Sequence, residues 1–115
     1  MSDPESGYLE FVRLPFFERS SRDVLSEEEI RRLEERLISD PWAGDLVANT
    51  GGVRKIRAAQ EGRGRSGGAR VVYLYVAIRE TIYLLLTYPK NVQATLTDDQ
   101  KRRLRELVAR LRKEG

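Results

Sequence analysis

A chain of 115 residues has room for one hydrophobic core, so we expect a single domain over residues 1–115. It contains no cysteine and no histidine, which excludes disulfides, thiolate nucleophiles and catalytic arrangements built on histidine. The net charge of +3 is unevenly distributed, because residues 1–50 carry six Lys and Arg against twelve Asp and Glu, whereas residues 51–115 carry fifteen against six. The second half is therefore expected either to meet a polyanion or to be a solvated charged face.

The first elements expected along the chain are a short strand and a helical turn. Residues 8–14 alternate between apolar and polar side chains, which is typical of a strand, and Pro15 interrupts the pattern. A helical turn or short helix is expected within residues 16–25. Residues 1–6 are polar and are predicted to be disordered.

The clearest helix is predicted to begin after Ser26. Ser26 and Glu29 have the spacing of a capping box, in which each side chain accepts a hydrogen bond from the backbone of the other. Asp40 ends this helix, because the residue before a proline is pushed out of the helical region. A second capping box, at Thr97 and Gln100, begins an amphipathic C-terminal helix with a basic outer side.

Three strands are predicted between these helices, over residues 51–59, 69–78 and 81–88. Alternation along the first of them puts Lys55 and Arg57 on the same face. Short links between consecutive strands imply antiparallel pairing. We therefore predict an α+β fold, a small antiparallel β-sheet in the order β-α-α-β-β-β-α with helices packed on it.

The loop at residues 62–68 reads GRGRSGG, and its first six residues match the spacing G-x-G-x-x-G of dinucleotide sites. Such a site needs a helix directly after the glycines, whereas here a strand is predicted from residue 69 onward. The sequence therefore predicts no nucleotide cofactor. The loop is either a flexible hairpin connection or part of a surface that binds a polyanion.

Positive charge is concentrated around this loop. Residues 54–70 contain a single acid and six cations, namely Arg54, Lys55, Arg57, Arg63, Arg65 and Arg70. Phosphate groups relieve the mutual repulsion of such a cluster, so nucleic acid is the expected partner. Tyr73 and Tyr88 lie on the neighbouring strands, where they either stack on unpaired bases or belong to the edge of the core.

Three motifs together resemble one known family: G-G-x-R-K-x-R at residues 51–57, G-x-G-x-x-G-G-x-R at 62–70 and Y-x-K-N at 88–91. Over residues 50–112 the chain is similar to the RelE/ParE toxin superfamily, and within it to the HigB-type branch. The resemblance implies a RelE-like fold and a bacterial type II toxin that enters the A site of the 30S ribosomal subunit and cuts translated mRNA. It also implies a cognate antitoxin, which in this branch is often a HigA-like helix-turn-helix protein.

RNA carries its own nucleophile, the 2′-hydroxyl, so its cleavage requires a base, positive charge at the phosphate and a proton donor, but no metal ion and no cofactor. A lysine acts as a base where nearby positive charge or desolvation lowers its pKa, and Lys55, between Arg54 and Arg57, is the candidate base. From the resemblance, Arg57 and Arg70 would stabilise the phosphate charge. Lys90 would donate a proton or clamp a phosphate.

Further contacts to messenger or ribosomal RNA are expected from six residues around these four: Arg54, Arg63, Arg65, Tyr73, Tyr88 and Asn91. RelE itself has an arginine where Asn91 stands and a tyrosine further on, and this chain has neither. The roles that these two residues imply in RelE, proton donation and stacking on a base, are therefore not assigned to residues of this chain.

Two other functions stay open at this point. A gyrase-poisoning toxin of the ParE type has the same fold, and a basic RNA-binding module would bind without cutting. No stretch of the sequence is long and apolar enough to cross a membrane, and the N-terminus lacks the pattern of a signal peptide. We therefore expect a cytoplasmic protein.

Overall fold

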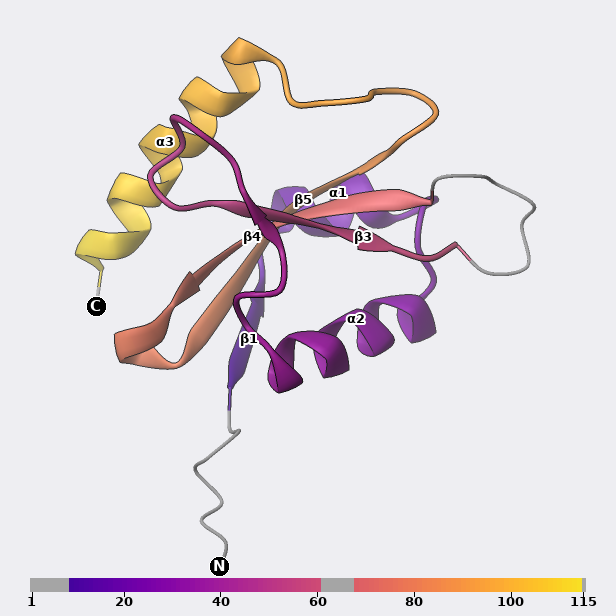
Figure 1. Cartoon of the computed structure of the whole chain (residues 1–115), viewed down its shortest axis with the longest axis horizontal. Helices are drawn as coiled ribbons and strands as arrows, with labels where there is room; N and C mark the ends of the chain where they lie inside the picture. Colours follow the sequence, from indigo (N-terminus) through magenta and orange to yellow (C-terminus); the bar gives the residue numbers. More distant parts are fainter. Residues whose placement is uncertain (1–8, 61–67, 115) are drawn as a thin grey trace, which may run out of the picture.

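The computed structural model describes residues 9–60 and 68–114 (Figure 1). The predictions for residues 1–6 and for residues 62–67 of the glycine loop, including Arg63 and Arg65, lie outside them. Five strands form one sheet: β1 (Glu10–Arg13), β2 (Asp45–Leu46), β3 (Arg54–Ala58), β4 (Ala69–Val76) and β5 (Thr81–Pro89). The helices are α1 (Pro15–Ser21), α2 (Glu27–Ser39) and α3 (Asp98–Lys113), and a short 3-10 helix, η1 (Ala77–Arg79), connects β4 to β5.

The strands lie side by side in the order β1-β5-β4-β3-β2. β3, β4 and β5 pair antiparallel, as the short links between them predicted. The prediction of a wholly antiparallel sheet is wrong at β1, which runs parallel to β5. Two helices and three strands separate this pair in the chain, so the rule for short links does not apply to it. β2, a two-residue strand that pairs with β3, was not predicted.

Side-chain contacts tie β1 to α2. Arg13 forms ion pairs with Glu27 (2.9 Å) and Glu34 (3.1 Å), both on α2. The hydrogen bond from Arg13 holds the pKa of the Glu27 carboxyl below its usual range. These contacts attach the edge strand β1 to α2, the second helix along the chain.

Both predicted capping boxes are present. The Ser26 hydroxyl accepts a hydrogen bond from the Glu29 backbone (3.0 Å), and the Glu29 carboxylate accepts one from the Ser26 backbone (2.8 Å). Thr97 and Gln100 make the same pair of bonds at the start of α3, at 3.1 and 2.9 Å. Within residues 9–60 and 68–114, no helix is long and apolar enough to cross a membrane.

The core has two parts, one on each face of the sheet. On one face, α1 and α2 bury Phe17, Leu33 and Leu37 against Ile56, Val71, Tyr73 and Leu84. On the other face, α3 buries Leu104, Val108 and Leu111 against Val53, Val72, Leu74 and Leu86. Figure 1 shows α2 and α3 on opposite sides of the sheet. We call these the α1/α2 face and the α3 face.

A bulge in β5 changes which residues of that strand meet each face. Tyr73 of β4 lies opposite Leu84, whereas the next residue back, Val72, lies opposite Leu86, so Leu85 is the extra residue. Leu84 packs on the α1/α2 face, but Leu85 and Leu86 both pack on the α3 face. Strict alternation from Leu84 would put Leu86 and Tyr88 on the α1/α2 face. Because of the extra residue, both lie on the α3 face instead.

Candidate functional site

Three predicted site residues form one row across the sheet. Arg57 of β3 lies directly opposite Arg70 of β4, and Arg70 lies directly opposite Tyr88 of β5. Directly opposite side chains in an antiparallel sheet point to the same face with Cβ atoms about 5 Å apart. Tyr88 packs with the α3 core, so the row lies on the α3 face. We call it the Arg57 row, and the two arginines on neighbouring strands offer positive charge to an anion on that face.

Lys55 lies in the next row on the same face. It is opposite Val72, a core residue of the α3 face, and therefore diagonal to Arg70. On its other side Lys55 is opposite Asp45 of β2, and this neighbouring carboxylate was not predicted from the sequence. A two-residue strand has no periodicity to reveal it, so no sequence signal pointed to Asp45.

Lys90 and Asn91 lie at the same end of the sheet as the Arg57 row. The Lys90 backbone N–H donates to the Gly68 carbonyl (3.1 Å), next to the first pair of the β4–β5 ladder, and both Lys90 and Asn91 are exposed. Gly68 has a φ of +62°, and a Cβ atom there would lie 2.7 Å from the Ala58 carbonyl oxygen. Only glycine fits this close approach of β3 and β4 without strain.

Arg54 does not join the row. It lies opposite Tyr73, whose side chain packs on the α1/α2 face. Its guanidinium donates to the carbonyls of Trp42 (3.1 Å) and Gly44 (2.7 Å) and lies 5.0 Å from the centre of the Trp42 ring. Of the two cations that flank Lys55 in the sequence, only Arg57 therefore shares its face.

Tyr73 corrects a prediction, because it is fully buried and cannot stack on a base. Its hydroxyl donates to the Pro41 carbonyl (2.8 Å) and accepts from the Gly44 backbone N–H (2.9 Å). Burial raises the pKa of this hydroxyl. Tyr73 is a core residue of the α1/α2 face that holds the segment after α2 against the sheet.

Tyr88 also cannot stack on a base, because its residue is only 3% exposed and its ring belongs to the α3 core. Its hydroxyl is buried and finds no hydrogen-bond partner among the residues that the structure describes. Burial raises the pKa of Tyr88, and the positive charge of Arg70 opposes that rise. The ring is thus a core element, while the hydroxyl is within the electrostatic influence of Arg70, the residue opposite it in the row.

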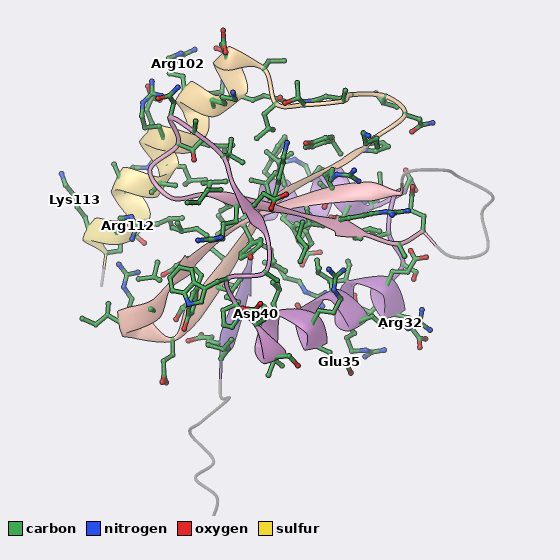
Figure 2. The ribbon with its side chains drawn as sticks, in the orientation of Figure 1. Arg32, Glu35, Asp40, Arg102, Arg112 and Lys113 are labelled. Atoms are coloured by element: carbon green, nitrogen blue, oxygen red, sulfur yellow. The ribbon has the colours of Figure 1, made fainter. Side chains whose placement is uncertain are left out.

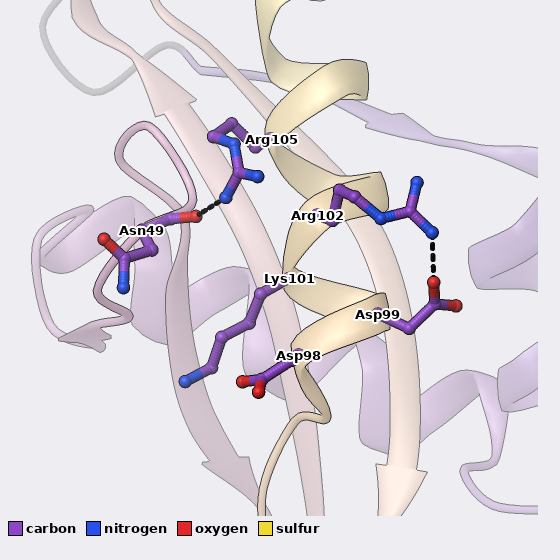
Figure 3. A pocket seen from close by; sticks show the side chains of 6 residues that line it. All are labelled: Asn49, Asp98, Asp99, Lys101, Arg102 and Arg105. Atoms are coloured by element: carbon purple, nitrogen blue, oxygen red, sulfur yellow. Dashed lines mark hydrogen bonds and ion pairs between the residues drawn. The ribbon is translucent and has the colours of Figure 1, made fainter.

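The outer side of α3 is basic, as predicted, and Figure 2 shows Arg102, Arg112 and Lys113 projecting from it. A pocket of about 570 Å³ lies between α3 and the loop before β3, lined by Asn49, Asp98, Asp99, Lys101, Arg102 and Arg105 (Figure 3). Arg105 donates to the Asn49 carbonyl (2.7 Å), and Arg112 donates to the Gly51 carbonyl (3.0 Å). These bonds attach the loop to α3 and so help to position β3. Among residues 9–60 and 68–114, no group of three or more His, Cys, Asp or Glu side chains is placed to hold a metal ion.

Comparison with protein families identifies the class of protein. The family model described as the RelE toxin of the RelE/RelB toxin-antitoxin system matches residues 13–114. The chain belongs to the RelE toxin family. Toxins of this family are ribonucleases that inhibit translation, so the prediction of a toxin of this kind is confirmed. The match does not divide the family further, and the HigB-type branch stays a prediction.

Two solved structures are similar to this toxin. The crystal structure of the intact E. coli RelBE toxin-antitoxin complex matches with a TM-score of 0.55 and 16% identity, over 71% of this chain and 96% of the other. The free state of an arginine double mutant of E. coli toxin RelE matches with a TM-score of 0.49 and 14% identity, over 75% and 87%. The first likeness confirms the predicted α+β fold of the RelE type.

Proposed function

We propose that this toxin cuts mRNA in the A site of the 30S ribosomal subunit, using the 2′-hydroxyl of the RNA as nucleophile and no metal ion. The observation that carries the proposal is the Arg57 row with its neighbours. Arg57 and Arg70 lie opposite each other on the α3 face, with Lys55 in the next row and Lys90 at the same end of the sheet. This is a concentration of positive charge on a rigid sheet, where a phosphate can be held in a fixed geometry.

The proposed reaction is a transfer of the phosphodiester within the RNA. The 2′-oxygen attacks phosphorus and loses its proton to a base, the bond to the 5′-oxygen breaks, and that oxygen takes up a proton. Arg57 and Arg70 stabilise the charge on the phosphoryl oxygens, for which paired guanidinium groups are suited. Lys90 donates the proton to the leaving oxygen or holds a neighbouring phosphate.

The attacking group is tested with an mRNA that carries a single 2′-deoxynucleotide at a mapped cutting position. Translating ribosomes are incubated with the purified toxin, and cuts are located by primer extension. We expect cutting at the unmodified position with a 2′,3′-cyclic phosphate end, and no cutting after the deoxy substitution. Attack by a metal-activated water would tolerate the substitution and leave a linear phosphate. Unmodified messages that stay intact would contradict the proposal and favour a gyrase poison or a module that only binds RNA.

Lys55 is the proposed base, and Asp45 opposite it is the competing group for the same role. We expect Lys55→Ala to lower the cutting rate on ribosomes by about 100-fold or more, because general base catalysis contributes on that scale. Asp45→Asn is expected to keep the rate within about threefold. Lys113→Ala, on the exposed end of α3, is the matched control for lost charge. If Asp45→Asn lost as much activity as Lys55→Ala, the carboxylate would be the base instead.

A cognate antitoxin is the expected partner, since the matching family consists of toxins from toxin-antitoxin systems. The E. coli relative was solved as a complex of toxin and antitoxin. We further propose that the antitoxin of this toxin is a HigA-like helix-turn-helix protein. A pull-down of the tagged toxin expressed with its neighbouring genes identifies it, and a partner without a DNA-binding domain would refute this proposal.

A further inference from the structure

Two buried tyrosines lie on opposite faces of the same sheet, and their hydroxyl groups differ. The Tyr73 hydroxyl makes two hydrogen bonds, to Pro41 and Gly44. The Tyr88 hydroxyl is equally closed off from solvent but makes none within residues 9–60 and 68–114. A buried hydroxyl without a partner destabilises a fold, and phenylalanine would fill the same space without that cost. Stability of the folded protein therefore does not account for the Tyr88 hydroxyl.

The position of Tyr88 connects its hydroxyl to the proposed site. Tyr88 lies directly opposite Arg70, in the Arg57 row, and Lys90 follows two residues later. The bulge at Leu85 is what turns Tyr88 to the α3 face. Arg70 is half-buried, and its positive charge acts on the Tyr88 hydroxyl across the strand pair. A change in the conformation of its long side chain on binding a phosphate would let that phosphate reach the hydroxyl.

We propose that the Tyr88 hydroxyl is a phosphate-binding group of the toxin, which donates a hydrogen bond to a non-bridging oxygen of the phosphate held by Arg70. The inference rests on the proposed function, because the ligand is the phosphate at the cutting position of the RNA. Binding of that phosphate supplies the partner that the hydroxyl lacks in the free protein. The ring of Tyr88 meanwhile stays in the α3 core and holds the hydroxyl in place, which lowers the entropy cost of the contact.

The test compares Tyr88→Phe with Tyr73→Phe. For Tyr88→Phe we expect an unchanged or higher midpoint of urea unfolding, and a cutting rate on translating ribosomes about 10- to 100-fold below wild type. For Tyr73→Phe we expect the opposite pattern, a lower midpoint and a wild-type cutting rate at temperatures where the variant is folded. The two variants remove the same atom from buried sites, so each is the control for the other.

A second readout uses mRNA in which sulfur replaces one non-bridging oxygen of the scissile phosphate, in each stereoisomer. Sulfur is a weak hydrogen-bond acceptor, so the stereoisomer with sulfur at the oxygen that Tyr88 contacts should be cut several-fold more slowly by the wild-type toxin. Tyr88→Phe lacks this hydrogen bond, so the same sulfur should not lower its cutting rate further. A purely structural role of Tyr88 would not produce this difference.

The outcomes separate the inference from the function on which it rests. If Tyr88→Phe cuts at the wild-type rate while Arg70→Ala is inactive, the inference is overturned and the proposed function stands. If Tyr88→Phe lowers the unfolding midpoint and loses activity only in proportion to unfolded protein, the role is structural and the inference is also overturned. If the wild-type toxin leaves mRNA intact, both proposals fail together.

Discussion

Arg70→Ala is expected to lower mRNA cutting on translating ribosomes by about 100- to 1000-fold, the scale on which one transition-state hydrogen-bond donor contributes. Arg70 is the middle residue of the Arg57 row, opposite both Arg57 and Tyr88, so its guanidinium is central among the proposed phosphate contacts. The Arg70 guanidinium stabilises a negative charge that is greatest in the transition state. Its removal should therefore lower kcat as well as kcat/KM. Cutting rates are measured by primer extension over time, at saturating and limiting ribosome concentrations.

Two variants make this experiment specific. Arg70→Lys keeps the charge but cannot grip a phosphate with two parallel hydrogen bonds, so it should recover only part of the activity. Arg31→Ala removes an exposed arginine from α2 and should cut at the wild-type rate. Circular dichroism confirms that each variant is folded. An Arg70→Ala variant that is folded and cuts within threefold of wild type would place the active site elsewhere.

Tyr73→Ala is expected to lower the free energy of unfolding by about 3 to 5 kcal/mol, as other large-to-small changes at buried aromatic residues do. The side chain is fully buried between the sheet and the helices of the α1/α2 face. Its removal leaves a cavity and also removes the hydroxyl that bonds Pro41 and Gly44. Because a small domain has only about 5 to 15 kcal/mol of stability, this variant should be close to unfolding at 37 °C.

Urea denaturation followed by circular dichroism measures this loss. Tyr75→Ala is the matched control, since Tyr75 is on the same strand and face but is partly exposed. It should cost less than Tyr73→Ala, although it also removes a ring contact with Trp42 at 4.7 Å. A loss below about 1 kcal/mol for Tyr73→Ala would show that the residue is not the core element described above.

Local patterns predicted the parts of the fold that local interactions control. The capping boxes at Ser26 and Thr97 satisfy backbone donors within one turn, so they can be found without any tertiary contact. The pairing of β3, β4 and β5 followed from their short links. The parallel pairing of β1 with β5 was not predicted. It depends on contacts between segments far apart in the sequence, including the ion pair of Arg13 with α2, and no local pattern reveals such contacts.

The errors at the candidate site have a similar cause. Arg54 was expected to contact RNA although alternation puts it on the opposite face from Lys55. Its guanidinium donates to the carbonyls of Trp42 and Gly44, contacts that no local pattern in the sequence shows. Tyr73 and Tyr88 were expected either to stack on unpaired bases or to belong to the edge of the core, and the burial of both rings decides for the core. Whether a strand tyrosine is exposed depends on which helices cover its face, and that is decided by the packing of the whole chain.

The sequence by itself determined the available chemistry: no histidine or cysteine, a cluster of arginine and lysine, and an alternation that puts Lys55 and Arg57 on one face. Only the tertiary structure decided which side chains meet there. Strict alternation from Leu84 would turn Tyr88 toward the α1/α2 face, away from Arg70. The extra residue at Leu85 reverses this, and such a bulge reflects how both faces of β5 pack against their helices rather than a pattern within the strand.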